Sequence, residues 1–331
     1  MIKNILYIPY YIFKTPRKAF FENVDYLSEK SLKSKILILI DVVYCSIVYS
    51  LSFNDYFMLR FFSKDKMERK EYAGTGFMYE YQLMMNPKKS RFVLEDKIEF
   101  LNYFSSYHGR RWYSINDFKE KREEIESLLF NTAKIVLKNS KGQAGKEVEV
   151  VDCMQINELE DYMRQKGYNL IEEFVVQHDK IQELAPRGLN TIRIITQRTN
   201  NNTIDILGAI LRLSIESNTD NLSVGNAAVH IDLLSGKVDR AAVYGDFRKE
   251  NIEIHPISNV SIVGFEIPFW QECLTIVKHA ALEAKENKSI GWDVAITNEG
   301  PILIEGNHNW GRVLWQLPVN KGLKYKLEKY I

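Results

Sequence analysis

Residues 291–307 have the sequence GWDVAITNEGPILIEGN, in which two apolar runs flank an Asn-Glu-Gly turn at 298–300. This arrangement predicts a β-hairpin. Asp293 lies near the start of the first strand, and Glu305 and Asn307 lie at the end of the second. Residues two apart on a strand point to the same face, so three oxygen donors are expected at one end of the hairpin. Such donors suit Mg²⁺. The alternative is that Glu305 and Asn307 merely end a strand.

A second candidate site lies at residues 134–150, KIVLKNSKGQAGKEVEV, a predicted strand, glycine-containing loop and returning strand. Backbone N–H groups near Gly142 and Gly145 can form a nest for phosphate, and Lys138 on the first strand can reach the same charge. The stretch lacks the Gly-Lys-Ser/Thr and following helix of a Walker A loop. An ordinary hairpin turn is the alternative.

Two arginines are expected inside a long antiparallel pair of strands, predicted at 191–198 and 203–213. Arg193 and Arg212 lie there among apolar neighbours. A buried guanidinium group requires an anion to offset its desolvation. That anion is either a structural carboxylate or a transferred phosphate.

In their order along the chain, these features resemble the sugar-transfer-associated branch of the ATP-grasp superfamily. The motifs are a strand lysine, a glycine loop, an acidic hinge and a late Asp…Glu-x-Asn triad, joined by Gln177-His178, Leu189–Ile194, Asp220-Asn221 with Gly225, and Gly291–Asp293. The resemblance runs from about Lys134 to the C-terminus and is weaker through the N-terminal third. It departs at Asn226, where the family usually has a second glycine.

The resemblance implies an α+β fold of the ATP-grasp type, in which two α+β subdomains clasp ATP. A mainly helical N-terminal region precedes them in the chain. The expected boundaries are 1–113 for the helical region, 114–176 for the small subdomain with the glycine loop, and 177–331 for the large subdomain with the metal site. The helical region would bind the acceptor or contact a membrane peripherally.

The resemblance also implies a nucleotide site. Lys138 would contact the α- and β-phosphates of ATP, and the loop containing Gly142, Gly145 and Lys146 would cover the triphosphate. Adenine and ribose would contact the hinge and the polar residues after it, namely Glu172, Glu173, Phe174, Val175, His178 and Asp179.

The metal and the transferred group would be held by the large subdomain. Asp293, Glu305 and Asn307 would bind one or two Mg²⁺ ions between the β- and γ-phosphates. Arg193 would balance charge on the transferred phosphate, which the resemblance favours over a structural carboxylate. For Arg212 both partners remain open.

Candidate acceptor contacts lie elsewhere in the chain. Arg110 and Arg111, in a basic aromatic turn, can clamp a carboxylate or sugar phosphate bidentately; a surface loop anchored by its tryptophan is the alternative. Asp220 and Asn221 belong to a polar loop near the same end of the sheet. The pair Asp96-Lys97 is either a further acceptor contact or a solvated helix start.

The implied activity is that of an ATP- and Mg²⁺-dependent carboxylate–amine ligase that forms an amide through an acyl phosphate. The branch points to surface-polysaccharide biosynthesis, with an amino acid joined to a uronic acid or a similar sugar acid. Expected partners are a small acid and a small amine, or a sugar nucleotide or glycan. The alternatives are an ATP-grasp kinase acting on a hydroxyl group, and a non-enzymatic nucleotide-binding scaffold at the membrane surface.

Composition narrows the partners and the compartment. A net charge of +1 provides no global field for nucleic acid. Cys45, Cys153 and Cys273 are too few and too scattered for a disulfide framework or a zinc site, which favours a reducing, cytoplasmic compartment and core positions for all three.

The N-terminal region contains a strongly apolar stretch at 36–51, which includes Asp41 and falls short of the ~20 residues that span a bilayer, so a buried helix is expected. No signal-peptide cleavage site follows Met1–Tyr11. Basic residues outnumber acidic ones around it, which permits peripheral contact with an anionic membrane or simply makes a solvated basic face: Lys14, Arg17, Lys18, Lys30, Lys33 and Lys35 against Glu22, Asp25 and Glu29.

Overall fold

The computed structural model describes residues 7–142, 147–218 and 222–331. It contains two antiparallel sheets, flanking helices and a helical N-terminal region, so the predicted α+β class is confirmed. The helices are α2 (Ile8–Lys14), α3 (Arg17–Ser31), α4 (Lys35–Tyr49), α5 (Phe53–Met58), α6 (Lys66–Glu71), α7 (Thr75–Met85), α8 (Phe92–Glu95), α9 (Lys97–Tyr103), α10 (Arg122–Asn131), α11 (Ile156–Lys166), α12 (Asp179–Leu184), α13 (Trp270–Glu283), α14 (Arg312–Gln316) and α15 (Tyr325–Glu328). The strands are β1 (Trp112–Ser114), β2 (Lys134–Lys138), β3 (Val148–Asp152), β4 (Leu170–Glu173), β5 (Ile192–Arg198), β6 (Ile204–Leu213), β7 (Ala227–His230), β8 (Val243–Tyr244), β9 (Ser289–Thr297) and β10 (Gly300–Asn307).

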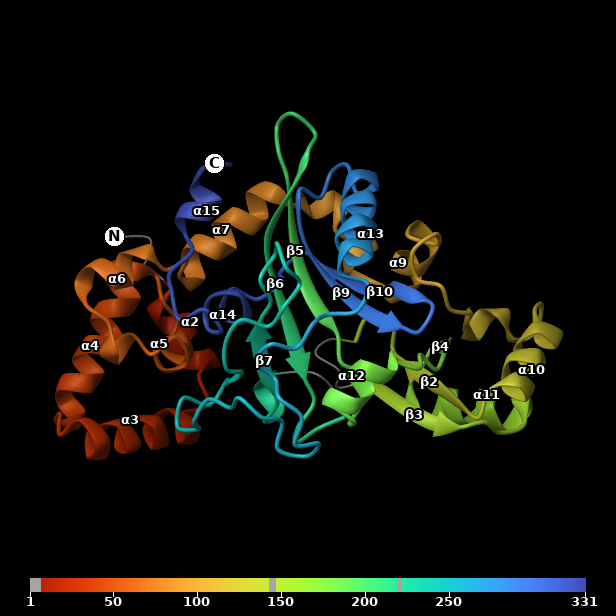
Figure 1. Ribbon diagram of the computed structural model, residues 1–331, viewed down its shortest axis with the longest axis horizontal. Coiled ribbons are helices and arrows are strands. Elements are labelled where there is room, and N and C mark those ends of the chain that lie inside the picture. The colour runs from red at the N-terminus through yellow and green to blue at the C-terminus, as the bar shows by residue number, and fades with distance from the viewer. Residues whose placement is uncertain (1–6, 143–146, 219–221) are drawn as a thin grey trace.

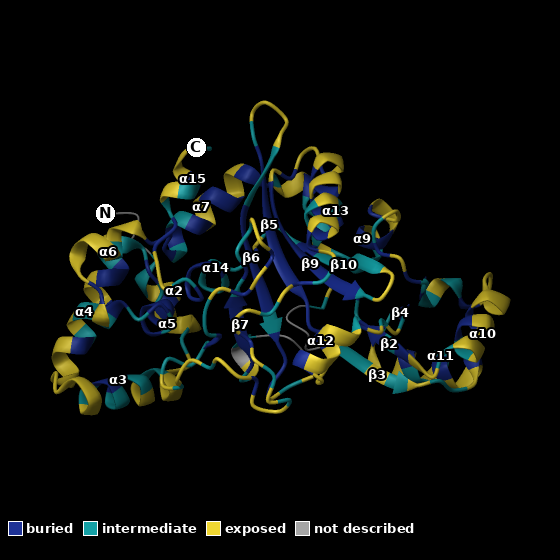
Figure 2. Ribbon diagram, in the orientation of Figure 1, coloured by how far each residue is buried: buried dark blue, intermediate teal, exposed yellow. Residues whose placement is uncertain are grey.

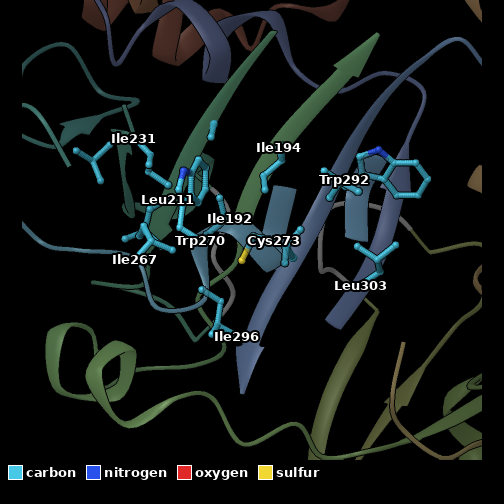
Figure 3. Packing of buried hydrophobic residues seen from close by; sticks show 14 of the residues in the cluster. Ile192, Ile194, Leu211, Ile231, Ile267, Trp270, Cys273, Trp292, Ile296 and Leu303 are labelled. Carbon is cyan, nitrogen blue, oxygen red and sulfur yellow. The ribbon is translucent and has the colours of Figure 1, made fainter. Parts of the chain in front are cut away.

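The larger sheet has the strand order β10-β9-β5-β6-β7-β8 and occupies the middle of the molecule (Figure 1). Alternate residues of its long strands face opposite sides, as strand geometry requires. Ile194 and Trp292 pack with Cys273 of α13 in the main hydrophobic core (Figure 3). On the other face, Ile195 and Ile210 belong to a second cluster, with buried residues of α7 and α14. Helices therefore pack on both faces of this sheet.

The smaller sheet has the strand order β1-β4-β2-β3. Its strands pack against α10 and α11 around a separate core that includes Ile125, Leu137, Leu159 and Ile171. Figure 1 shows this unit at one end of the molecule, beside β9 and β10 of the larger sheet. Two sheets with separate cores leave room for a cleft between them.

The N-terminal residues divide into two groups. Helices α2 to α5 contribute to a core of their own, in which Val42, Phe57 and Phe61 are buried together with Leu317 from the C-terminal end. Helices α7 and α9 instead pack on the larger sheet, through residues such as Met78 and Phe100. Across the described ranges, no helix is both long and apolar enough to cross a membrane.

Several expected elements differ in detail. In residues 114–130, Ser114 is followed three residues later by Asp117, a capping pattern that predicts one helix. The structure has a 3₁₀ turn at Ile115–Phe118 followed by α10, with that capping box in place. The apolar run at 168–176 predicts a strand over its whole length, whereas the structure confines the strand to β4. The Ser235-Gly236 turn between two apolar runs predicts a hairpin over 227–244. In the structure its pairing is reduced after β7 to an isolated bridge between Ile231 and Val238.

Two further expectations need correction in their burial. The apolar stretch at 36–51 forms α4, but only one side of this helix is buried, whereas Ile36 is 69% and Ile40 is 59% exposed. Of the three cysteines, Cys45 and Cys273 are buried and Cys153 is half-buried.

Candidate active site

One row of cross-strand neighbours brings charged residues together in the larger sheet. Glu305 of β10 is paired with Asp293 of β9, and Asp293 with Arg193 of β5. Directly opposed residues in a sheet stand on the same face. Because Trp292 and Val294 face α13, the intervening Asp293 points to the opposite side of the sheet.

Asp293 is buried and ion-paired with two arginines. Arg193 binds it in a fork, with Nε on Oδ1 and Nη2 3.0 Å from Oδ2, and also donates from Nη1 to the carbonyl oxygen of Trp310 at 2.9 Å. Arg212 Nη2 lies 2.7 Å from Oδ2 of the same carboxylate. Burial alone raises the pKa of Asp293, but the charges of Arg193 and Arg212 outweigh it and hold the pKa at about 2.

Glu305 has the opposite electrostatic environment. Its burial, and the neighbouring Asp293 carboxylate, raise the pKa of Glu305 above its usual value. Asn307 Nδ2 donates to Glu305 Oε1 at 3.1 Å. Two carboxylates side by side in a buried site repel each other, and a divalent cation relieves that repulsion.

The donor set therefore fits a hard cation. Glu305 and the amide oxygen of Asn307 present oxygen ligands, and Asp293 adds a carboxylate that already accepts from both arginines. A carboxylate has about four lone-pair sites, so Asp293 has little capacity left. In the described part of the chain, no group of three or more His, Cys, Asp and Glu side chains forms a metal cluster. The candidate ligand set depends on an asparagine.

A second charged cluster lies in the smaller sheet. Lys138 Nζ is 2.8 Å from Glu172 Oε1, and Arg110 Nε is 2.6 Å from Glu172 Oε2. Burial lowers the pKa of Lys138. Burial also acts to raise the pKa of Glu172, but the charges of Arg110 and Lys138 prevail and hold it at about 2. The buried carboxylate is thus kept ionised between two cations.

The two clusters face one cavity of about 1450 Å³. Eleven of the residues predicted from the sequence line it, from both sheets: Lys138, Gly142, Glu172, Glu173, Phe174, Val175, Arg193, Arg212, Asp293, Glu305 and Asn307. Lys138 faces this cavity from the smaller sheet, and Asp293 and Glu305 face it from the larger sheet with Arg193 and Arg212 beside them. Cations and acidic oxygens around one cavity suit a polyphosphate with its metal.

Four predicted residues do not line the cavity. Arg110 is buried between Glu172 and β10, where Nη1 donates to the carbonyl oxygen of Leu303 at 2.8 Å, so it is neither an acceptor clamp nor a surface loop. Arg111 is occupied by Glu173, 2.9 Å away.

His178 and Asp179 form the start of α12 instead. The ring nitrogen Nδ1 of His178 accepts a hydrogen bond from the backbone N–H of Lys180 at 3.0 Å, and the ring packs on Phe269. Asp179 Oδ1 accepts from Asn298 Nδ2 at 3.2 Å. The side chains of His178 and Asp179 are therefore engaged in contacts at the start of α12.

Four other predicted residues, Gly145, Lys146, Asp220 and Asn221, lie outside the described residues. The neighbouring departure from the family pattern has a structural role. Asn226 is fully buried, and its Oδ1 accepts from the backbone N–H groups of Ile215 and Glu216 at 2.7 and 3.0 Å. The asparagine therefore holds the chain after β6 in place.

Lys97, whose role the sequence left open, contacts the glycine loop. Its backbone N–H donates to the carbonyl oxygen of Ser140 at 2.9 Å, and Nζ donates to the carbonyl oxygens of Asn139 and Gly142. Lys97 thus joins α9 to the glycine loop and lines the cavity. The Asp96-Lys97 pair was a usable signal, because Asp96 caps the helix, with Oδ1 accepting from Ile98 N at 2.9 Å, and leaves the lysine at its first turn.

The far end of the cavity has a different lining that the sequence did not indicate. It includes four apolar side chains, from α5, from the 3₁₀ turn at Leu222–Val224 and from α14: Met58, Leu222, Val313 and Leu314. Arg187 also lines the cavity. These residues come from widely separated parts of the chain, so no local pattern connects them.

The two-sheet fold, with a strand lysine in the smaller sheet facing an Asp, Glu and Asn group in the larger one, defines an ATP-grasp protein. A family model described as sugar-transfer associated ATP-grasp matches residues 77–330, and the chain belongs to that family. It thereby joins a superfamily of ATP-dependent ligases. A comparison with curated proteins finds no match.

Among solved structures, the chain is similar to three enzymes at low identity. They are an N5-carboxyaminoimidazole ribonucleotide synthetase in complex with ADP (TM-score 0.41, 11% identity, 65% of this chain and 45% of that chain), the biotin carboxylase domain of the Hydrogenobacter thermophilus 2-oxoglutarate carboxylase with MgADP, ADP and bicarbonate (0.44, 14%, 75% and 52%), and the L-amino acid ligase of Bacillus licheniformis (0.42, 12%, 71% and 49%). The matched region spans about half the length of each of them.

Proposed function

We propose that this protein is an ATP- and Mg²⁺-dependent carboxylate–amine ligase. The observation that carries the proposal is the cavity itself, where Lys138 from the smaller sheet and Glu305 and Asn307 from the larger sheet face the same space. A phosphoryl-transfer site needs cations for the phosphates, hard ligands for a metal and a way to balance charge on the transferred group. Lys138 would supply the cation, Glu305 and Asn307 the metal ligands, and Arg193 and Arg212 the charge balance.

The nucleotide would lie between the sheets. Lys138 and Lys97 supply cations for the phosphates, and Gly142 begins the loop beside them. Lys138 forms an ion pair with Glu172 at 2.8 Å, and in this arrangement it would pair with the triphosphate instead. The backbone at Phe174 and Val175 is the proposed adenine contact, because β4 ends there and its following N–H and C=O groups are not used by the sheet.

The metal would be bound by Glu305 and Asn307, with Asp293 as a partial ligand. A bound Mg²⁺ would neutralise phosphate charge and orient the transferred group. Arg193 and Arg212 hold Asp293 at this point of the sheet and place two positive charges beside it. We propose that they also stabilise the negative charge that develops on the transferred phosphate.

The proposed reaction has two steps. An oxygen of the substrate carboxylate attacks the γ-phosphorus of ATP, the bond from that phosphorus to the β–γ bridging oxygen breaks, and ADP leaves. The amine nitrogen then attacks the acyl carbon, the carbon–oxygen bond to phosphate breaks, and the amine loses a proton. The products are an amide, ADP and phosphate.

The family description and the form of the cavity support a sugar acid and an amino acid as the two substrates. Sugar transfer in the family description favours a uronic acid or glycan acceptor and a role in surface-polysaccharide biosynthesis. The apolar side chains at the far end, including Met58 and Leu314, would pack against the less polar face of a sugar ring or an amino-acid side chain.

The test is an assay for ADP release with paired panels of sugar acids and amino acids. ADP release should require both an acid and an amine and should stop when Mg²⁺ is chelated. With acid, ATP and hydroxylamine, a hydroxamate should form, since hydroxylamine traps an acyl phosphate. ADP release with a hydroxyl acceptor alone, accompanied by a phosphorylated product, would establish the kinase instead.

A further inference from the structure

Helix α4 carries an apolar surface that its own fold leaves exposed. Ile38, Val42 and Cys45 on one side of the helix are at most 1% exposed and belong to the N-terminal core. On the other side, Ile36 is 69% and Ile40 is 59% exposed. A surface helix of a globular protein is usually polar on the side that faces water. Apolar residues on both sides of α4 therefore indicate that its outer side contacts something other than water.

This surface is extended by neighbouring residues at helical spacing and at the preceding turn. We call it the α4 surface, and it consists of Leu32, Ile36, Leu37, Ile40, Val43, Tyr44 and Val48. Among the described residues, 11 of the 30 exposed large apolar side chains lie between residues 10 and 48, in a small fraction of the chain. Figure 2 shows α3 and α4 at the end of the molecule opposite α10 and α11. The exposed apolar side chains are therefore concentrated at the end of the molecule away from the smaller sheet.

Leu32 is the most prominent member of the α4 surface. It is 94% exposed and has a backbone φ of 55°, in the left-handed region that residues with a Cβ seldom adopt. A large apolar side chain at such a turn is presented to solvent rather than folded back. Lys30 and Lys33 flank it in the sequence, and both are exposed.

Basic charge surrounds the α4 surface. Lys35 begins α4 and forms an exposed ion pair with Asp25 at 2.8 Å, so Lys30 and Lys33 remain as the exposed cations beside Leu32. Residues 1–72 contain 12 Lys and Arg against 8 Asp and Glu, whereas the rest of the chain contains 32 against 35. The positive charge of the protein is therefore concentrated in the part that carries the α4 surface.

We propose that the α4 surface docks on an anionic lipid bilayer, with α4 lying in the plane of the interface. Apolar side chains would enter the boundary of the acyl chains while the lysines contact acidic headgroups. The orientation follows from the packing, because the side of α4 with Ile38 and Val42 is held in the protein core. A second copy of the chain fits less well, since a symmetric contact would bring the lysines of both copies together.

The inference goes beyond the proposed function and does not depend on it. The α4 surface and the cavity between the sheets share no residue. Nucleotide binding and membrane docking are therefore expected to be separable by substitution. Docking would bring the enzyme to substrates held at a bilayer.

The experiment is cosedimentation of the full chain with vesicles of phosphatidylcholine alone or of phosphatidylcholine and phosphatidylglycerol. We expect binding to the anionic vesicles, weakened by salt. The double variant Ile36→Ser/Ile40→Ser should bind about tenfold more weakly, because two apolar side chains no longer enter the bilayer. The control Phe130→Ser/Leu234→Ser removes two side chains that are each 90% exposed elsewhere and should bind like the natural chain.

Charge is tested separately. Lys30→Glu/Lys33→Glu should reduce binding to anionic vesicles about tenfold, from the loss of two headgroup contacts, while the exposed-site control Lys285→Glu should leave it unchanged. ATP binding should be the same in every variant, which shows that the fold is intact.

Analytical sedimentation without lipid tests whether a second copy of the chain covers the α4 surface instead. If the natural chain does not bind vesicles and forms a dimer that Ile36→Ser/Ile40→Ser dissociates, a second copy is the occupant and the proposal is overturned. Equal binding to neutral and anionic vesicles, or no binding to either, would also overturn it.

Discussion

Asp293 and Glu305 face each other across the β9–β10 hairpin, yet their surroundings treat negative charge in opposite ways. Two arginines hold the pKa of Asp293 at about 2, whereas burial and Asp293 itself raise the pKa of Glu305. The protein pays in stability for this unbalanced carboxylate. Such a cost is expected where a bound cation later restores the balance.

The first residue-scale prediction concerns Glu305→Gln. Without a cation, this variant should be as stable as the natural chain or more stable by about 1 kcal/mol, because the repulsion between the half-buried Glu305 carboxylate and the buried Asp293 carboxylate is removed. Its melting temperature should no longer rise when Mg²⁺ is added to ATP, because a metal ligand is lost. Thermal unfolding with ATP plus Mg²⁺, and with ATP plus a chelator, measures both effects. A variant that loses stability without ligands yet keeps the Mg²⁺-dependent shift would contradict this assignment.

A second prediction concerns Lys138→Ala. ATP affinity should fall roughly 10- to 100-fold, since a charge-assisted contact to phosphate is removed. Titration calorimetry gives the dissociation constant, and Lys119→Ala, at an exposed lysine just before α10, is the matched control. An unchanged dissociation constant in a folded Lys138→Ala protein would show that the phosphates bind elsewhere.

The candidate site residues could be predicted where the sequence placed a charge beside a recognisable strand. Lys138, Glu305 and Asn307 were found in this way, and they share the cavity. Arg110 was not understood, because its partner Glu172 is 62 residues away and no local pattern connects them. Gly291 also has a role visible only in three dimensions: a Cβ there would lie 2.2 Å from Trp310 Cβ and 2.9 Å from Arg193 Cδ.

At the scale of elements, strand β10 contains an irregularity on which the site depends. The register between β9 and β10 shifts between Leu303 and Glu305. A β-bulge leaves an extra residue outside the regular ladder and re-aims the side chains that follow. Arg110 occupies this point, donating to the carbonyl oxygens of Leu303 at 2.8 Å and Ile304 at 3.2 Å. Through Arg110 and Glu172, strand β4 is attached to β10.

The hairpin at 291–307 was predicted from its turn and apolar runs, and the structure confirms it as β9 and β10. The bulge was not predictable, because a one-residue shift depends on long-range contacts such as those of Arg110. The prediction of one helix over 114–130 was wrong for a local reason. The capping box at Ser114 and Asp117 begins a single 3₁₀ turn, and α10 begins only at Arg122.

The attachment of β4 predicts an acid-dependent stability. The pKa of Glu172 in the folded protein is about 2, below its unfolded value of 4.5, so protonation favours unfolding. Its contribution, on the order of 3 kcal/mol, is complete above about pH 4.5 and is lost as the pH falls toward 2. Glu172→Gln should therefore be less stable at neutral pH and should show a flatter dependence between pH 4.5 and 2.

Urea unfolding at pH 7, 4 and 3 measures this difference. Glu173→Gln is the graded comparison, because Glu173 is paired with Arg111 but its side chain is 28% exposed, against 3% for Glu172. It should show a smaller effect of the same sign. Parallel acid profiles for Glu172→Gln and the natural chain would exclude Glu172 as the group responsible.

At the scale of the whole molecule, the N-terminal helices and the C-terminal end form one wall of the cavity. Met58 ends α5, and Val313 and Leu314 belong to α14; all three line the cavity. An ion pair between the buried Asp55 of α5 and the half-buried Arg312 of α14 holds the two helices together. The family model begins at residue 77, so this wall is built partly by residues that the family pattern does not cover.

The ion pair predicts that the N-terminal region affects the acceptor end of the cavity and spares the nucleotide end. Asp55 is 3% exposed and also accepts a hydrogen bond from Thr75 Oγ1 at 2.8 Å. Asp55→Asn keeps the shape of the side chain but leaves the Arg312 charge without its counterion, which should cost about 2 kcal/mol of stability. Displacement of α14 should then lower acceptor-dependent ADP release several-fold, while the dissociation constant for ATP stays within about twofold, because the nucleotide residues lie on other elements. Thermal unfolding, calorimetry with ATP and the ADP assay separate these effects, and the exposed substitution Glu22→Gln in α3 controls for a general effect of charge in this region. An Asp55→Asn protein that weakens ATP binding as strongly as acceptor turnover would mean that α5 and α14 support the whole cleft rather than its far end.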